Sequence, residues 1–86
     1  MEIKNLNKRL LKEIIKEVNE KQKIPITINK VEIELKGELL YVGTVTCSEP
    51  QRVWDLPLEV TLKNDTFYWI LSDNLAAGYF VNSNSA

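Results

Sequence analysis

Histidine is absent from this 86-residue chain, which removes the commonest general base and metal ligand of proteins. Cysteine occurs once, at Cys47, so no internal disulfide can form and stability must come from packing. Because unpaired thiols are typical of reducing compartments, we expect a cytoplasmic location, and an extracytoplasmic one if a signal or anchor segment has been removed. The first residues are charged and lack an uninterrupted apolar core, which argues against a signal peptide.

Glycine and long apolar runs are also scarce. The three glycines, Gly37, Gly43 and Gly78, form no phosphate-binding loop. No run approaches the roughly 18 apolar residues that span a bilayer, so we predict no membrane insertion. Cysteine and carboxylate spacings typical of metal sites are missing too, and we expect no metal ligands and no cofactor.

Positive charge is sparse outside the first third of the chain. Residues 1–30 carry eight Lys or Arg and four Glu, a net +4, whereas residues 31–86 carry three basic and eight acidic residues, a net −5. Nucleic-acid binding needs a strongly basic surface with interleaved aromatic residues, so we predict none. Glu32 and Glu34 have the spacing of a solvated strand face, and nothing implies the apolar pocket that acid catalysis requires. We therefore predict no catalytic residues and no enzymatic activity.

An amphipathic helix is the strongest pattern present. Its apolar stripe comprises Ile3, Leu6, Leu10, Leu11, Ile14, Ile15 and Val18. Asn5 is a suitable N-cap and Pro25 cannot continue the helix, which predicts a helix over about residues 5–22. A helix of this length with one apolar face is unstable alone, so another element must cover that face.

Alternating apolar and polar residues then predict strands at about residues 30–36, 39–48, 53–63 and 66–72. The apolar positions change parity between Ile28 and Val31, which indicates either a bulge or an extended connector, and we favour the connector. A tight turn is expected at Gly37 and Glu38, and another at residues 64–65.

Two residues inside these strands point to local irregularities. Gly43 indicates a bend or a close approach of two backbones. Pro57 indicates an edge or a bulge in the third strand. The sequence thus predicts one α+β domain, residues 1–86, in which a curved four-stranded antiparallel meander over residues 30–72 packs on the N-terminal helix and a tail follows at 73–86.

The second face of the predicted sheet carries a surplus of apolar side chains, namely Leu40, Val42, Tyr68 and Ile70. Either the tail or a partner must cover them. We therefore predict a non-enzymatic interaction module that binds a protein partner, or a second copy of itself, through a sheet face or edge. The alternatives are an inhibitor or immunity-type protein, and a carrier of a small hydrophobic ligand held by Tyr41, Trp54 and Trp69.

One short segment, Gln51-Arg52-Val53-Trp54, is similar to the start of the Gln-x-Val-x-Gly motif of the cystatins. In these protease inhibitors an antiparallel sheet wraps one long helix, and residues 5–72 resemble this layout. Many small bacterial domains resemble it too. The resemblance implies a cystatin-like fold and a loop that enters a protease cleft. The sequence departs from the motif at Asp55, which replaces its glycine, and the segment falls in the second hairpin after the helix rather than the first.

Overall fold

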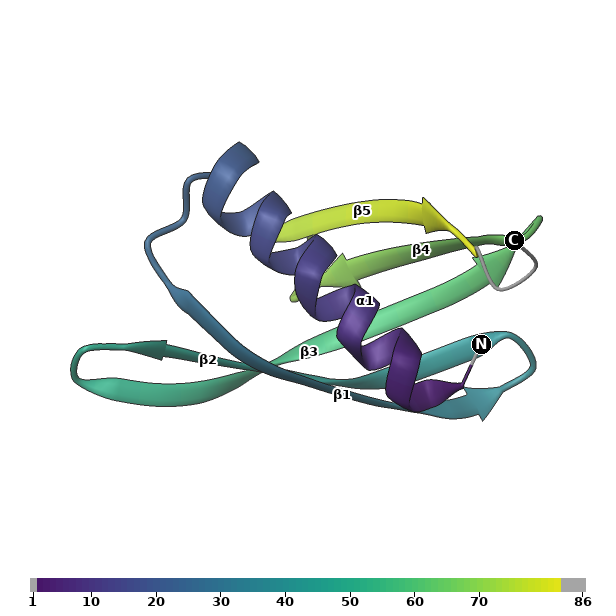
Figure 1. Ribbon diagram of the computed structural model, residues 1–86. Coiled ribbons are helices and arrows are strands. Elements are labelled where there is room, and N and C mark those ends of the chain that lie inside the picture. Colours follow the sequence, from purple (N-terminus) through teal and green to yellow (C-terminus); the bar gives the residue numbers. More distant parts are fainter. Residues whose placement is uncertain (1, 83–86) are drawn as a thin grey trace.

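One helix lies across one face of an antiparallel sheet in the computed structural model, which describes residues 2–82 (Figure 1). Helix α1, Ile3–Ile15, continues as a π-helical segment, η1, Lys16–Lys21. The strands are β1 Thr27–Gly37, β2 Leu40–Glu49, β3 Arg52–Lys63, β4 Thr66–Leu71 and β5 Ala76–Val81, and each pairs with the next. The α+β class is confirmed, and the sheet has five strands instead of four. Residues 83–86 of the predicted tail lie outside the described residues.

The helix begins and ends close to the predicted residues. It starts at Ile3 with Glu2 as the N-cap, so the cap predicted at Asn5 is wrong. Gln22 follows the last turn as its C-cap, which agrees with the predicted end. The buried stripe, Leu6, Leu10, Ile14 and Val18, repeats every four residues. Because that spacing exceeds 3.6 residues per turn, the stripe drifts around α1, and the wider turn of η1 reduces the drift only at its last member, Val18.

Strand β1 contains the bulge that the parity change indicated. Ile28 pairs with Cys47 and Lys30 pairs with Thr46, so Asn29 is an extra residue without a partner in the ladder. The bulge lets both Ile28 and Val31 face the core. The preference for a connector over a bulge was therefore wrong, because the strand already begins at Thr27.

The turns differ in how far the sequence predicted them. Asn64 and Asp65 form the turn predicted between β3 and β4, both with positive φ, as a type I′ hairpin turn requires. The first hairpin turns one residue later than predicted, at Glu38 and Leu39, with Leu39 at φ 60°. Residues 72–74 also have positive φ, and they reverse the chain so that the predicted tail returns as β5.

Gly43 and Pro57 occupy the positions that their chemistry suits. A Cβ atom on Gly43 would collide with the carbonyl oxygen of Glu32 and lie 2.6 Å from Cα of Ile33, which confirms a close backbone approach. The carbonyl of Pro57 accepts a hydrogen bond from the Ser72 amide at 2.9 Å, on the β4 side of β3. The nitrogen of Pro57 faces the same side, at a point beyond the end of β4. Its missing N–H therefore removes no hydrogen bond between β3 and β4.

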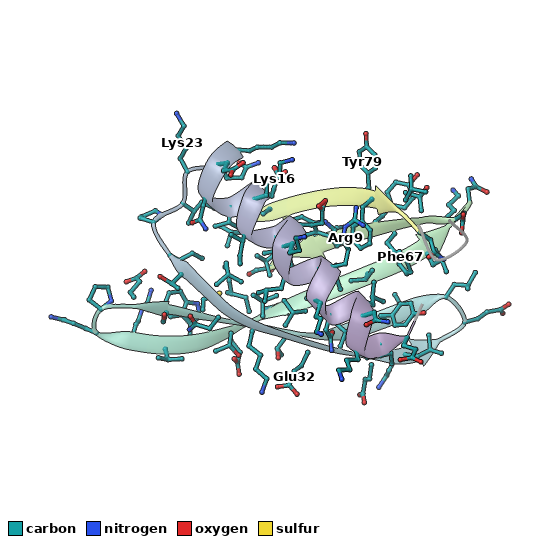
Figure 2. The ribbon with its side chains drawn as sticks, in the orientation of Figure 1. Arg9, Lys16, Lys23, Glu32, Phe67 and Tyr79 are labelled. Atoms are coloured by element: carbon teal, nitrogen blue, oxygen red, sulfur yellow. The ribbon has the colours of Figure 1, made fainter. Side chains whose placement is uncertain are left out.

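The hydrophobic core fills the space between the helix and the inner face of the sheet. Trp69 and Phe67 are its largest side chains, and Phe67 packs on Phe80 at 5.3 Å between ring centroids and edge-on to Tyr41 at 6.2 Å. Figure 2 shows Phe67 and Arg9 in this region, where the Arg9 guanidinium lies 4.7 Å from the centre of the Phe80 ring. Every strand and the helix thus contribute to one core.

Replacing Gly43 by alanine tests the close approach of β1 and β2. The new methyl group has no room, so Gly43→Ala should lower the free energy of unfolding by about 3 kcal/mol. Gly37→Ala is the matched control, because a Cβ atom there meets nothing within 4 Å, and its effect should stay within about 1 kcal/mol. Urea unfolding monitored by tryptophan fluorescence measures both. Equal effects at the two positions would contradict the assignment.

Burial of Cys47 predicts an alkaline loss of stability. Burial, and secondarily the charge of Asp55, raises the pKa of the Cys47 thiol above its ordinary 9.0. The thiol's stabilising contribution is therefore complete below about pH 9 and is lost as pH rises through the higher folded-state pKa. Urea unfolding at several pH values from 8 to 10.5 should show a shallower alkaline decline for Cys47→Ala than for the wild type. Identical slopes would be the opposite result.

Candidate interaction surface

The four residues predicted as an interaction surface do share the outer face of the sheet, but they form two separate pairs. Tyr68 and Ile70 on β4 are 45% and 44% exposed, whereas Leu40 and Val42 on β2 are half-buried. Strand β3 lies between the pairs and places the polar residues Thr61 and Glu59 in the same rows. Only the β4 pair therefore belongs to a well-exposed apolar surface.

The tail extends this apolar surface instead of covering it. Strand β5 pairs alongside β4 and brings Ala77, Tyr79 and Val81 next to Ile70, Tyr68 and Thr66. Tyr79 is 70% exposed and Val81 60%, and the Tyr68 and Tyr79 rings lie 6.0 Å apart. We call Tyr68, Ile70, Ala77, Tyr79 and Val81 the outer apolar patch. The expectation that the tail covers the outer face is wrong for its described part, residues 73–82, because that part adds three members to the patch.

Opposite this patch, at the β1 end, the outer face is charged. Lys30, Glu32 and Glu34 occupy its outward positions, and the Lys30 ammonium pairs with the Glu32 carboxylate at 2.6 Å. That hydrogen bond raises the pKa of Lys30 above its ordinary value. Figure 2 shows Glu32 and Tyr79 at opposite borders of the molecule. The polarity of the outer face therefore changes across the sheet, from charged at β1 to apolar at β5.

Strand β5 also forms an open edge of the sheet. The Asn82 amide donates to the carbonyl of Asp65 at 2.8 Å, so Asn82 and every second residue before it face β4. Ala77, Tyr79 and Val81 therefore direct their backbone N–H and C=O groups away from the sheet. Within residues 2–82 no strand pairs with that side. The edge carries no charged side chain and no proline, which are the usual devices against unwanted pairing.

Beside this edge lies an open groove of about 700 Å³. It is lined by charged helix residues, by Trp69 and Gly78, and by four members of the outer apolar patch: Glu13, Lys16, Glu17 and Lys21, and Tyr68, Ile70, Ala77 and Tyr79. Both carboxylates that line it have cationic neighbours, since Glu17 lies 3.7 Å from Lys21 and Glu13 lies 3.8 Å from Arg9. The indole N–H of Trp69 is buried and has no hydrogen-bond partner within the described part of the chain. A Cβ atom on Gly78 would lie 2.8 Å from this indole, so only glycine fits beside it.

The segment that resembles the cystatin motif lies elsewhere, at the tip of the β2–β3 hairpin (Figure 1). Pro50 and Gln51 form the turn. Arg52 stacks on the Trp54 ring at 4.2 Å and lies 3.6 Å from the Glu49 carboxylate, while Val53 is 67% exposed. The structure thus places the Gln51–Trp54 segment and the outer apolar patch on different parts of the sheet, as two separate surfaces.

Ligand binding, metal binding and membrane insertion can also be compared with the structure. Trp69 is a core residue, and Tyr41 and Trp54 pack against the margin of the core. Of these three residues only Trp69 lines the groove beside β5, so the structure does not bring the predicted carrier residues together around that groove. Within residues 2–82 no three acidic or cysteine side chains are grouped so that they could hold a metal ion. In the same range no helix is long and apolar enough to cross a bilayer.

The sequence pattern does not predict the outward positions of Ala77, Tyr79 and Val81. The only signal for them was the apolar character of residues 75–81, in which apolar residues occupy both faces of the strand and hide the alternation. Comparison with known proteins adds nothing to the assignment, since the chain matches no protein family, no curated protein and no solved structure.

Proposed function

We propose that this chain is a non-enzymatic protein-interaction module that binds through the outer apolar patch and the adjacent β5 edge. The observation that carries the proposal is the exposure of Tyr79 and Val81, at 70% and 60%, beside the half-exposed Tyr68 and Ile70. Single exposed apolar residues are ordinary on a protein surface, whereas a contiguous group of this kind marks an interaction site.

Simple energetics indicate why the edge belongs to the proposed site. Burying a large apolar side chain completely contributes about 1.5–3 kcal/mol, and these side chains are already partly buried, so four of them supply roughly 5 kcal/mol. Association costs about 4–15 kcal/mol in lost translational and rotational freedom. The patch alone would therefore bind weakly. Backbone hydrogen bonds to the open β5 edge would supply both further affinity and a fixed orientation.

An inhibitor that acts through the β2–β3 hairpin is the alternative function. It is favoured by one observation, the exposed Val53 at a projecting hairpin tip. Because the hairpin tip and the outer apolar patch are separate, substitutions at Val53 and at Ile70 distinguish the two functions.

A capture experiment tests the proposal. The immobilised chain is incubated with extract of the organism that encodes it, supplemented with a tagged copy of the chain itself. Ile70→Lys and Tyr79→Lys should each reduce the retained protein at least tenfold, because a lysine in the buried interface must lose its hydration. Thr44→Lys is the matched control, since Thr44 is exposed on the charged part of the same face, and it should retain as much as the wild type.

Thermal unfolding accompanies the capture assay. All three substitutions are at exposed positions, so each should change the unfolding free energy by only about 0.5 kcal/mol. Retention that is insensitive to Ile70→Lys and Tyr79→Lys would refute the proposed surface. Retention that is lost with Val53→Lys alone would favour the inhibitor.

A further inference from the structure

We infer that the occupant of the β5 edge is a second copy of this chain, paired antiparallel through β5 so that two five-stranded sheets join into one continuous sheet of ten strands. This inference rests on the proposed function and names the partner at the β5 edge of the proposed surface; the outer face of β4 stays accessible in the joined sheet. It is carried by the two edges of the sheet, by the symmetry of the outward-facing backbone groups, and by the side chains that a two-fold axis would bring together.

The two edges of the sheet are built differently. Edge strand β1 carries Lys30, Glu32, Glu34 and Lys36 and a bulge after Ile28, all of which discourage pairing with another strand. Edge strand β5 has none of these features. A two-fold dimer through β5 pairs both unprotected edges with each other and leaves a charged β1 at each end of the joined sheet, which closes the assembly at two copies.

The backbone of β5 suits a two-fold axis at Tyr79. Three residues direct their N–H and C=O groups outward, and Tyr79 is the middle one, with Ala77 and Val81 at equal distances from it. With the axis at Tyr79, the two Tyr79 residues pair with each other and Ala77 of each copy pairs with Val81 of the other. Each pair exchanges two hydrogen bonds, so every outward-facing group of the strand is used. An axis at Gly78 would place Val81 opposite Leu75 of the other copy, which lies before the strand, and would leave the groups of Val81 without a partner in β5.

The side chains around this axis are compatible with a copy of themselves. Residues that lie on or near a two-fold axis face their own kind, so a charged residue there would meet a like charge. The central residue is the neutral Tyr79, and the strand contains no charge at all. On the outer face the 6.0 Å contact between Tyr68 and Tyr79 would extend into a row of four tyrosines across the joined sheet. The formal charge of −1 per chain adds little repulsion between the copies.

Disulfide trapping tests both the partner and the register. Directly opposed residues of an antiparallel pair have Cα atoms about 5.5 Å apart, within the range of roughly 4.4–6.8 Å that a disulfide bridges. Mild oxidation of Tyr79→Cys should therefore give a covalent dimer, while the fully buried native Cys47 does not compete. Ala77→Cys alone should not cross-link, because its two copies lie about 13 Å apart along the strands. A mixture of Ala77→Cys and Val81→Cys should cross-link. Any other pattern overturns this register.

Light scattering over a concentration series gives the second measurement. The wild-type chain should pass from monomer to dimer as concentration rises. Ala77→Pro should raise the dissociation constant at least tenfold, because it removes an N–H that points away from β4 toward the second copy. The hydrogen bonds to β4 stay intact, just as Pro57 leaves the pairing of β3 intact. Thr44→Lys should leave the constant unchanged, and circular dichroism verifies that both variants are folded.

The outcomes separate this inference from the proposed function. A chain that stays monomeric at every concentration, while its outer apolar patch captures a different protein, refutes the second copy and leaves the interaction function standing. A monomer without any patch-dependent capture refutes both. A dimer that Ala77→Pro does not weaken would mean that the copies associate elsewhere, and the β5 pairing would be wrong.

Discussion

The burial of one helical stripe against the inner face of the sheet is the interaction on which the rest of the structure depends. Leu6, Leu10, Ile14 and Val18 are all fully buried, and at about 1.5–3 kcal/mol each they contribute an amount comparable to the whole stability of a small domain. The inner face of the sheet must pack along this stripe. Two local features of β1 and β2 make that packing possible. The bulge after Ile28 restores the inward parity of β1, and Gly43 allows the two strands to approach without a side chain between them.

Packing of the helix on the inner face of the sheet leaves the outer face free for other contacts. A single helix covers only one face of a sheet, so the other face meets solvent or a partner. Over β1 the outward positions are lysine and glutamate, and over β3 they include Glu59 and Thr61. Over β4 and β5 they become aromatic and aliphatic. The proposed binding surface follows from this change in polarity across one continuous sheet. Its residues lie on strands that are already held in place by their inward-facing core residues.

The helix, strands β1 to β4 and the α+β class could be predicted because their apolar residues have a clear period. Strand β5 could not, because Ala76, Gly78 and Phe80 face inward while Ala77, Tyr79 and Val81 face outward, and a strand that is apolar on both faces shows no alternation. Its turn was also hidden, since residues 72–74 adopt positive φ without glycine. The candidate surface was predicted in part. Tyr68 and Ile70 belong to it, but the position of Leu40 and Val42 depends on the register across β3, which the sequence does not reveal.

The outward residues of β5 are the part of the sequence that the monomer does not explain. The inward residues are constrained, because Gly78 fits against the Trp69 indole and Phe80 packs on Phe67. Ala77 and Val81 face no such constraint, and Tyr79 contacts only the ring of Tyr68 across the outer face. Glu59 and Thr61, two strands away on the same face, show that the fold accepts polar residues there. An uncharged apolar edge carries a risk of aggregation, so its presence is best explained by a partner that covers it.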